Sequence, residues 1–484
     1  DPRRPRAGGP RRLRLDRVRD VLRACPDWAG ALHSRAVPPT SDLDRLYLDH
    51  VIALQGQVER LLAGLGWDAM VVHSGSPARR SGFDDQHWPL RPVPHWQHWS
   101  SLAEADCALV VRPGRRPKLL RQHVRSFWEA PAPVDIKALD EAFDVAALGD
   151  AGDVRRELSN GHTAFVGEDA GRAQSWGIEA DGRNPPPLMR ALDALRTTKT
   201  PYEVACIAEA NRRARAGHEA LFAAFRQGDA SELDLHLRYL QATAQDDWET
   251  PYKNIVALGP SAATLHHVSY TRGTIARESE SLLVDAGATC RGYCADVTRT
   301  WVKGIGGAAR AFAALISAVD AMQTRLSSAV RVGERYEALH DESHHQVAEI
   351  LRSAGIVRTS ADEAVARGVT RAFYPHGLGH SLGLQTHDVG CATREPQANN
   401  PFLRNTTDIA VGQVFTIEPG IYFIEDLLER LRASPAGASV HWPAVGELSP
   451  FGGVRVEDDI HVTGDARVIR NLTREHLPSG GGVG

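Results

Sequence analysis

Five residues in this sequence are of the types that bind divalent metal ions, and each lies in a short apolar or turn-bounded stretch. They are Asp285, Asp296, His380, Glu418 and Glu457. If these side chains converge, four carboxylates and one imidazole would give a site with a charge of about −4. An apolar interior tolerates such a charge only when cations balance it. Two divalent ions would do so, and the sequence therefore predicts a two-metal hydrolase site.

Two of the acids are expected on the arms of one hairpin. The stretches 281–288 and 294–302 have the composition of strands, and Arg291-Gly292-Tyr293 between them is typical of a tight turn. Asp285 would lie on the first arm and Asp296 on the second. A carboxylate that points inward beside apolar neighbours is costly unless it binds a cation. Rigid sheet positions also hold the coordination geometry that a metal ion needs.

The other three candidates belong to later segments. Strands are predicted at 414–418 and 454–461, which would carry Glu418 and Glu457, and His380 ends a glycine-rich loop. Taken singly, each acid is more simply an exposed turn or edge residue, and only the set of five favours a metal site. Ligation by several carboxylates and one histidine suits hard ions, so manganese is expected rather than zinc or copper.

The composition is that of an ordinary globular protein. The chain has 484 residues, 42% of them hydrophobic and 24% charged, which is long enough for two or three domains. The formal net charge of −4 is small, so neither a nucleic acid nor a membrane is expected as a partner. The six cysteines lack the spacing of zinc fingers, and free thiols in a reducing cytoplasm are expected.

The sequence divides into three parts. Residues 1–40 form a basic extension that is expected to be disordered, with an organelle transit peptide as the alternative. Residues 41–185 alternate helical and strand-like stretches, which predicts a small α/β domain that ends at a run of prolines. Residues 186–484 continue with helices followed by antiparallel strand pairs, an α+β pattern.

Three local features of the second half complete these expectations. Thr200-Pro201-Tyr202-Glu203 has the pattern of a capping box and predicts the start of a long helix. His344-His345 lies in a polar helical stretch, where exposed side chains are expected. The glycine-rich tail at 480–484 is expected to be disordered.

A set of motifs carries a more specific pattern. They are Asn254-Ile255-Val256-Ala257-Leu258, Ala263-Thr264-Leu265-His266, Leu283-Val284-Asp285-Ala286-Gly287-Ala288, Ala295-Asp296-Val297-Thr298-Arg299-Thr300, Pro375-His376-Gly377-Leu378-Gly379-His380, Gly383-Leu384-Gln385-Thr386-His387-Asp388-Val389, Thr416-Ile417-Glu418-Pro419-Gly420 and Pro450-Phe451-Gly452-Gly453-Val454-Arg455-Val456-Glu457-Asp458. Together they resemble the metal-dependent Xaa-Pro dipeptidases (prolidases), close to the bacterial branch that includes the organophosphorus acid anhydrolases. The resemblance implies an α+β pita-bread catalytic domain, preceded by a smaller α/β creatinase-like amino-terminal domain.

The resemblance also implies a role for each metal-ligand candidate. By this similarity Asp285 would bind one metal ion, Asp296 and Glu457 would bridge two ions, and His380 and Glu418 would hold the second ion. Glu418 would also carry a proton during catalysis.

Further positions match residues that line the substrate site in this family. They are Tyr252, His266, His376, His387 and Arg455. His267 stands where an aromatic residue commonly follows, so which of the two adjacent histidines takes the role is open. Asp85, in a loop with Phe83 and Trp88, matches an acidic position that reaches the site of a neighbouring subunit, which implies a homodimer.

The expected function is hydrolysis of Xaa-Pro dipeptides with release of proline by a cytoplasmic enzyme, with a side activity on organophosphorus esters. An aminopeptidase P-like cleavage of longer Xaa-Pro peptides is the alternative enzymatic activity. A non-catalytic, peptidase-like binding module is the alternative from another class, and it is disfavoured because all five ligand positions are filled.

Overall fold

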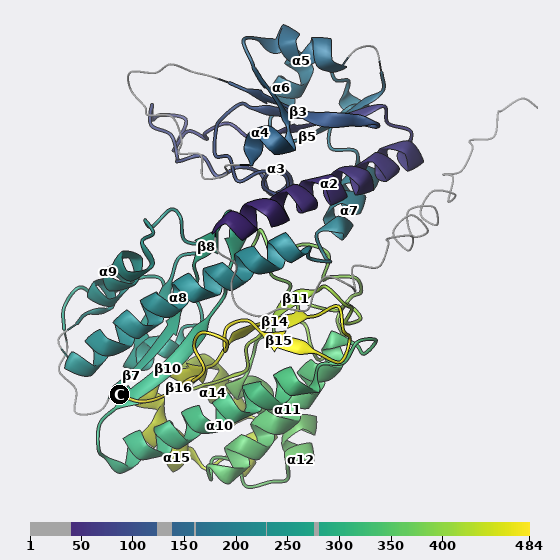
Figure 1. The fold of residues 1–484 in the computed structure, drawn as a ribbon. Helices are drawn as coiled ribbons and strands as arrows, with labels where there is room; N and C mark the ends of the chain where they lie inside the picture. Colours follow the sequence, from purple (N-terminus) through teal and green to yellow (C-terminus); the bar gives the residue numbers. More distant parts are fainter. Residues whose placement is uncertain (1–39, 123–137, 159–160, 229, 275–279) are drawn as a thin grey trace, which may run out of the picture. The chain divides into compact units, whose positions relative to one another are not determined.

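The computed structural model describes residues 40–122, 138–158, 161–228, 230–274 and 280–484. These residues pack as two compact units, which divide between Leu195 and Arg196 (Figure 1). The predicted basic extension lies outside the described residues, apart from its last residue, Thr40. Both helices and sheets occur in each unit, as the α/β and α+β predictions require.

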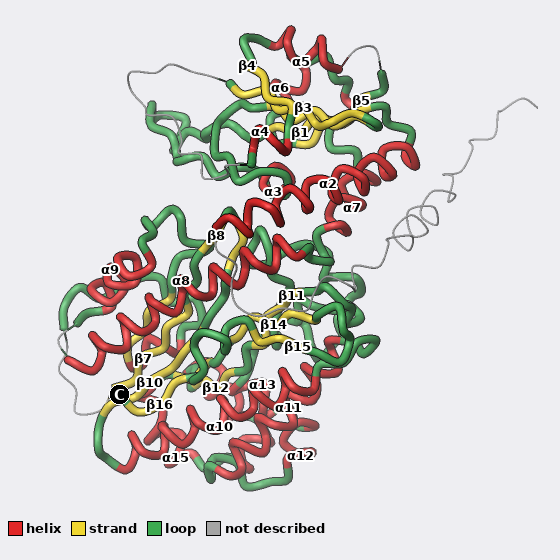
Figure 2. The backbone as a smooth tube through the Cα atoms, viewed as in Figure 1, coloured by secondary structure: helices red, strands yellow, loops and turns green. Residues whose placement is uncertain are grey.

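The amino-terminal unit is built on one five-stranded mixed sheet with the order β4-β3-β2-β1-β5 (Figure 2). The β1–β2 and β2–β3 pairs are antiparallel, and β3–β4 and β1–β5 are parallel. The strands are β1 (Ala69–His73), β2 (Ala108–Arg112), β3 (Arg115–Arg121), β4 (Asp144–Ala147) and β5 (Thr163–Val166). The helices are α2 (Thr40–Leu65), α3 (Pro94–Gln97), α4 (Leu139–Ala142), α5 (Ala151–Leu158), α6 (Ala170–Ser175) and α7 (Pro186–Leu195), with a 3₁₀ turn, η2 (Ala180–Gly182).

Alternation along the strands places apolar side chains on both faces of this sheet. Val71 and Val110 pack with residues of α5 and α6, and α2 contacts β2 and α7. The first described helix, α2, buries Leu43, Tyr47, Leu54 and Val58 along one face. Pro186 and Pro187 form the start of α7, and this unit ends at Leu195, beyond the predicted boundary at 185/186.

Helices of the carboxy-terminal unit begin with the long α8 (Pro201–Gln227). The capping box predicted at its start is confirmed. The Thr200 side chain accepts a hydrogen bond from the Glu203 backbone N–H, and the Glu203 side chain accepts one from the Thr200 backbone N–H. The others are α9 (Glu232–Thr243), α10 (Gly307–Ala329), α11 (Tyr336–Ser353), α12 (Ala361–Ala366), α13 (Val369–Phe373), α14 (Glu425–Ala433) and α15 (Trp442–Leu448), with the 3₁₀ turns η3 (Gly259–Ala263), η4 (Pro435–Ser439) and η5 (Ser449–Phe451).

Short sheets fill the space between these helices. Their strands are β6 (Ile255–Leu258), β7 (Glu280–Asp285), β8 (Thr289–Cys290), β9 (Tyr293–Cys294), β10 (Thr298–Lys303), β11 (Val414–Ile417), β12 (Gly420–Tyr422), β13 (Gly453–Arg455), β14 (Asp458–Val462), β15 (Ile469–Asn471) and β16 (Gly481–Val483). The sheet orders are β16-β10-β7-β6, β11-β14-β15, β12-β13 and β8-β9. All pairs are antiparallel except β10–β16.

The predicted hairpin is present and brings two of the acids together. β7 pairs with β10 so that Asp285 lies opposite Thr298, two residues after Asp296. The intervening chain forms the smaller β8–β9 hairpin, whose turn residues Arg291 and Gly292 have φ values of +49° and +89°. Positive φ at both central positions is the geometry of a type I′ turn.

The single strand predicted at 454–461 is instead two strands in two different sheets. β13 pairs with β12, and β14 pairs with β11. The break falls between Arg455 and Asp458, opposite Glu418 and Pro419, which separate β11 from β12. Pro419 has no N–H to continue a ladder, and its carbonyl oxygen accepts from Val456 N at 3.2 Å. Glu418 and Glu457 therefore both lie at interruptions of strands.

The glycine-rich tail predicted to be disordered forms β16, which pairs in parallel with β10. Gly481 has a φ of +142°, and a Cβ at this position would clash with the Thr300 carbonyl oxygen. Glycine is therefore what allows this close pairing. The tail is a structural part of the sheet that carries the hairpin.

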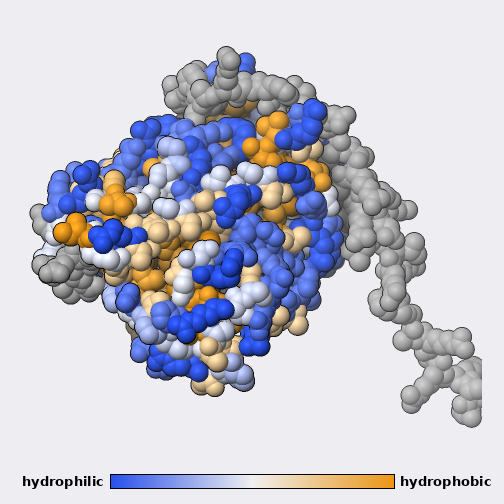
Figure 3. Space-filling model, turned by 90° about the horizontal axis from the view of Figure 1, so that it is seen from below, coloured by the Kyte–Doolittle hydropathy of each residue, from blue (hydrophilic) through white to orange (hydrophobic). Residues whose placement is uncertain are grey.

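Hydrophilic side chains surround small hydrophobic patches on the face drawn in Figure 3. Among the described residues, no helix combines the length and the apolar composition needed to cross a bilayer.

Candidate metal centre

Three of the five metal-ligand candidates have their ligand atoms close together. One atom each from Asp296, His380 and Glu457 lies within 4.8 Å of the other two, and all three residues are buried. Asp296 precedes β10, and the Glu457 backbone N–H donates to the Thr298 carbonyl oxygen at 3.1 Å, so the hairpin fixes the position of Glu457. His380 is held by its backbone N–H, which donates to Thr416 Oγ1 at 3.1 Å.

Glu418 belongs to the same cluster. His380 Nε2 lies 3.6 Å from Glu418 Oε1, and His376 Nδ1 lies 3.7 Å from Glu418 Oε2. The Glu418 backbone N–H donates to the Leu378 carbonyl oxygen at 2.8 Å, which ties the residue after β11 to the glycine-rich loop. The structure thus brings both histidines of that loop to one carboxylate.

Asp285, at the end of β7, is oriented by a chain of hydrogen bonds. Arg455 Nη2 donates to Asp285 Oδ2 at 2.6 Å, and Arg455 Nη1 donates to the Tyr422 hydroxyl at 2.9 Å. His376 Nε2 lies 2.8 Å from the same hydroxyl. Among the described residues, Asp285 Oδ1 is buried without a hydrogen-bond partner. Tyr422 was not predicted as a site residue, because an apolar strand gives no signal for a single functional hydroxyl.

Two hydroxyl groups orient the carboxylates at the centre of the cluster. The Tyr252 hydroxyl donates to Asp296 Oδ1 at 2.5 Å, and Thr298 Oγ1 donates to Glu457 Oε2 at 2.6 Å. Arg455 Nε donates in turn to Thr298 Oγ1 at 3.1 Å. Partners of this kind hold metal ligands in a fixed orientation.

Electrostatics show that the cluster carries more negative charge than its own cations balance. Burial, together with the neighbouring carboxylates, raises the pKa of Glu418 to about 7 and that of Glu457 well above its usual range. Burial also raises the pKa of Asp285. Burial opposes the charged form of Asp296 as well, but the adjacent His380 outweighs it and lowers the pKa of Asp296. Divalent cations would offset the repulsion among these carboxylates. Asp285 Oδ1, which has no hydrogen-bond partner among the described residues, could bind such an ion, so these residues fit a metal centre.

The three histidines of the site differ in charge. Burial alone would lower the pKa of His380, but Asp296 and Glu418 raise it to about 9. Its Nδ1 lies 3.0 Å from the Ser381 carbonyl oxygen, which leaves Nε2 facing the carboxylates. Burial lowers the pKa of His376 to about 3 and that of His387 to about 4, so both are neutral near pH 7. The His387 ring packs edge-on against His380 at 4.4 Å.

The two adjacent histidines between which the sequence left the role open have different surroundings. His267 Nε2 lies 2.9 Å from Glu232 Oε2 on α9, so the His267 ring pairs with a residue that is not part of the cluster. His266, in contrast, is exposed.

A cavity of about 470 Å³ opens beside His380 and His387. Its wall is formed by the segment between 388 and 406, including Arg394 and Arg404. Arg394 pairs with Asp408 at 2.6 Å, whereas Arg404 acts electrostatically on His387. Arg404 was not predicted as a site residue, because nothing in its local sequence distinguishes it from other loop arginines.

Asp85 belongs to the amino-terminal unit, whereas the cluster belongs to the carboxy-terminal unit. Its loop forms a small hairpin in which Arg79 bridges to His87 and Asp84 Oδ1 accepts from Gln86 N at 2.9 Å. Asp85 is exposed, and Phe83 beside it is fully exposed.

Comparison with known proteins covers both units. Residues 205–464 match the model of metallopeptidase family M24, and residues 45–194 match the model of the Xaa-Pro dipeptidase amino-terminal domain. An Xaa-Pro dipeptidase from Marinobacter nauticus is 39% identical over 440 residues, which cover 90% of this chain and 99% of the relative. One from Pseudoalteromonas atlantica is 37% identical over 444 residues, which cover 90% and 98%.

Among solved structures, zinc-substituted aminopeptidase P from Escherichia coli aligns with a TM-score of 0.65 at 22% identity, covering 91% of this chain and 96% of that one. An aminopeptidase from Pseudomonas aeruginosa aligns with the same TM-score at 20% identity. These likenesses confirm the expected fold, a pita-bread catalytic domain preceded by a smaller amino-terminal domain.

Proposed function

Because this chain belongs to metallopeptidase family M24, and within it to the Xaa-Pro dipeptidases, we propose that it hydrolyses Xaa-Pro dipeptides at a centre of two divalent metal ions. The observation that carries the proposal is the buried cluster of Asp296, His380 and Glu457, with Glu418 against it and Asp285 on the adjoining strand. Manganese is the proposed ion, since carboxylates dominate the donor set.

The five candidate ligands differ in the ion that each would hold. We assign Asp285 to one ion, His380 and Glu418 to the other, and Asp296 and Glu457 to both. Ions held there would supply Lewis-acid chemistry, which polarises a carbonyl group and activates water. This division follows the resemblance to the family, and the closeness of Asp296, His380 and Glu457 supports it.

Glu418 is the proposed proton carrier of the reaction. Its two oxygens face His380 and His376, so it lies at the edge of the cluster rather than behind it. It would take a proton from the attacking water and deliver it to the proline nitrogen as the peptide bond breaks. Neutral His376 holds the neighbouring Tyr422, because His376 Nδ1 donates to the Gly377 carbonyl oxygen and Nε2 accepts from the hydroxyl.

Arg404 is the proposed partner of the substrate carboxylate. Arg455, one of the residues expected to line the substrate site, is buried and already binds Asp285 and Tyr422. Arg404 lines the cavity beside His387, where a carboxylate would form charge-assisted hydrogen bonds with a guanidinium group.

We expect Arg404→Gln to raise KM for Leu-Pro by about 10- to 100-fold, the range of a lost hydrogen bond to a charged group. The turnover number should change less, because Arg404 binds the proline carboxylate and not the reacting atoms. Arg394→Gln is the matched control, since Arg394 lines the same cavity but pairs with Asp408. Equal changes in KM for the two variants would exclude this assignment.

The exposed loop with Phe83 and Asp85 is proposed to close the site of a second subunit in a homodimer. Exposed aromatic side chains are enriched at interfaces, and a carboxylate is a suitable partner for the free amino group of a dipeptide. Phe83 and Trp88 are both exposed in this loop.

Asp85→Ala should therefore lose activity on dipeptides while it keeps its metal ions. The loss should be about 10-fold or more, because an ion pair with the substrate ammonium is removed. Light scattering should show a dimer of the 52.7 kDa chain for both the variant and the wild type. A monomer with full dipeptidase activity would contradict this arrangement.

A comparison of Leu-Pro with Leu-Pro-Gly-Gly tests the proposed substrate class. The manganese-loaded protein should release proline from Leu-Pro and should act poorly on the tetrapeptide. Preference for the tetrapeptide would assign the chain an aminopeptidase P-like activity instead.

The five described cysteines are free thiols, which supports the proposed cytoplasmic location. Hydrolysis of organophosphorus esters stays a prediction.

A further inference from the structure

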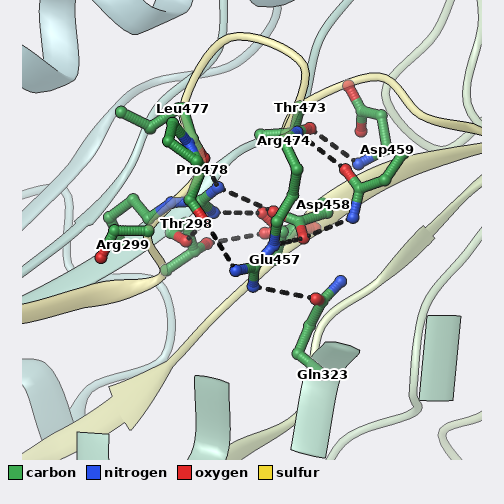
Figure 4. Close-up of polar contacts among 12 residues, drawn as sticks. Thr298, Arg299, Gln323, Glu457, Asp458, Asp459, Thr473, Arg474, Leu477 and Pro478 are labelled. Carbon is green, nitrogen blue, oxygen red and sulfur yellow. Dashed lines mark hydrogen bonds and ion pairs between the residues drawn. The ribbon is translucent and has the colours of Figure 1, made fainter. Parts of the chain in front are cut away.

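A polar network adjoins the proposed metal centre at Thr298 and Glu457 (Figure 4). It is centred on Arg299, the residue after Thr298 on β10. Successive strand residues point to opposite faces of a sheet. Thr298 therefore faces the site, where it donates to Glu457, and Arg299 faces away from it, where it is fully buried.

Arg299 binds the backbone of two residues of the site, Thr298 and Glu457. Its Nη1 donates to the carbonyl oxygens of Thr298 and Glu457, both at 2.9 Å. Its Nη2 donates to the Leu477 carbonyl oxygen at 2.9 Å and lies 2.8 Å from Asp458 Oδ1. One guanidinium group thus joins the hairpin, the residue Glu457 and the carboxy-terminal segment.

The carboxy-terminal segment 471–478 completes this support. Arg474 Nε donates to Asp458 Oδ2 at 2.7 Å, and Arg474 Nη2 reaches Asp320 Oδ1 at 2.5 Å and Gln323 Oε1 at 3.0 Å on α10. The two arginines and the two aspartates balance in charge, so the network adds no net negative charge beside an acidic site.

The same segment supports Asp296 through a second ring of hydrogen bonds. Thr473 Oγ1 accepts from the Asp459 backbone N–H at 2.9 Å and donates to Asn211 Oδ1 at 2.7 Å. Asn211 Nδ2 donates to Asp459 Oδ2 at 2.7 Å, and this oxygen also accepts from the Asp296 backbone N–H at 3.2 Å. Thr473 thereby fixes the carboxylate that holds the backbone of Asp296.

We propose that residues 471–478, through Arg474 and Thr473, position Glu457 and Asp296 for metal binding, so that the carboxy-terminal segment sets the metal affinity of the site. Arg474 and Thr473 act as positioning residues, because neither touches the cluster itself. The inference rests on the metal centre of the proposed function.

Three variants separate positioning from general stability. Arg474→Gln removes the pairing with Asp458 and Asp320. Thr473→Val removes one hydroxyl with little change of volume, and Thr473→Ser keeps that hydroxyl. Arg470→Gln is the matched control, because Arg470 lies in the same part of the chain and pairs only with the surface residue Glu475 in the contacts described.

The measurements are the dissociation constant of Mn²⁺ by calorimetric titration and the visible absorption spectrum of the protein loaded with Co²⁺. We expect Arg474→Gln and Thr473→Val to weaken Mn²⁺ binding by about 10-fold, the lower end of the effect of losing a direct partner of a metal ligand, because they act through Asp458 and Asp459. Both should alter the Co²⁺ spectrum, whereas Thr473→Ser and Arg470→Gln should match the wild type. Should Arg474→Gln fail to fold, the pair of Thr473 variants decides the question.

Variants with lower melting temperatures but wild-type Mn²⁺ affinity and an unchanged Co²⁺ spectrum would show that the segment only stabilises the fold, and would overturn the inference. A wild-type protein that takes up no Mn²⁺ would instead refute the proposed function. The two failures are therefore distinguishable.

Discussion

The Asp296→Asn variant should lose dipeptidase activity by more than about 100-fold. This is more than the usual effect of removing a residue that only hydrogen-bonds to a metal ligand. Asp296 lies between His380 and Tyr252, and its carboxylate is assigned to both metal ions. An amide is neutral and a weaker ligand, so both ions should bind less tightly. Steady-state release of proline from Leu-Pro and the metal content of the purified variant measure these effects.

Asp84→Asn is the control for this substitution. Asp84 lies in the amino-terminal unit, where its Oδ1 accepts from the Gln86 backbone N–H, a bond that an asparagine retains. Its activity and metal content should equal those of the wild type. A comparable loss in both variants would mean that the metal centre has been placed wrongly.

Glu418→Gln should lower the turnover number by about 10²- to 10⁴-fold, the contribution of a general acid–base residue. Glutamine has the shape of glutamate but cannot accept and deliver the proton that cleavage of the peptide bond requires. KM for Leu-Pro should change less, because the substrate carboxylate is assigned to Arg404. The kinetic constants, measured at saturating Mn²⁺, separate this loss from weaker metal binding.

Glu425→Gln provides the matched comparison, since Glu425 is exposed at the start of α14 and lies outside the cluster. It should keep wild-type kinetics. If Glu418→Gln retained more than a tenth of the wild-type turnover number at saturating Mn²⁺, another group would have to carry the proton.

Local signals in the sequence were sufficient for much of the fold. The capping box at Thr200 and the turn at Arg291-Gly292 depend on residues close together in the chain, and both predictions are confirmed. Strands β3 and β4 of the amino-terminal unit were not predicted. β3 contains four basic residues and Pro117 and has no clear alternation, so its place in the sheet depends on its neighbours β2 and β4.

The interrupted strands show where local reasoning fails. Residues 454–461 have the composition of one strand, but Arg455 pairs with Gly420 in one sheet and Asp458 pairs with Ile417 in another. Only the segment paired with it, which contains Pro419, determines where the ladder of hydrogen bonds breaks. His344 is a similar case: it was expected to be exposed in a polar helix, but it is buried beside Thr370 and Tyr374 from α13 and the loop after it.

The five metal-ligand candidates could be named from sequence because each lies in a recognisable motif. The contacts of these ligands could not, since they are long-range: Arg455 and Tyr252 were named as site residues, but their hydrogen bonds to Asp285 and Asp296 were not predicted. The distinction between His266 and His267 likewise required the position of Glu232 on a distant helix. The network of Arg299, Asp458 and Arg474 has no signature in any one segment.

The proposed two-metal centre can be tested by titrating Mn²⁺ into protein stripped of metal by a chelator while the release of proline from Leu-Pro is measured. We expect no release from the stripped protein and a recovery of activity that levels off at two equivalents of Mn²⁺ per chain, as a two-metal centre requires. Full activity in the stripped protein, or none after Mn²⁺ is restored, would contradict it.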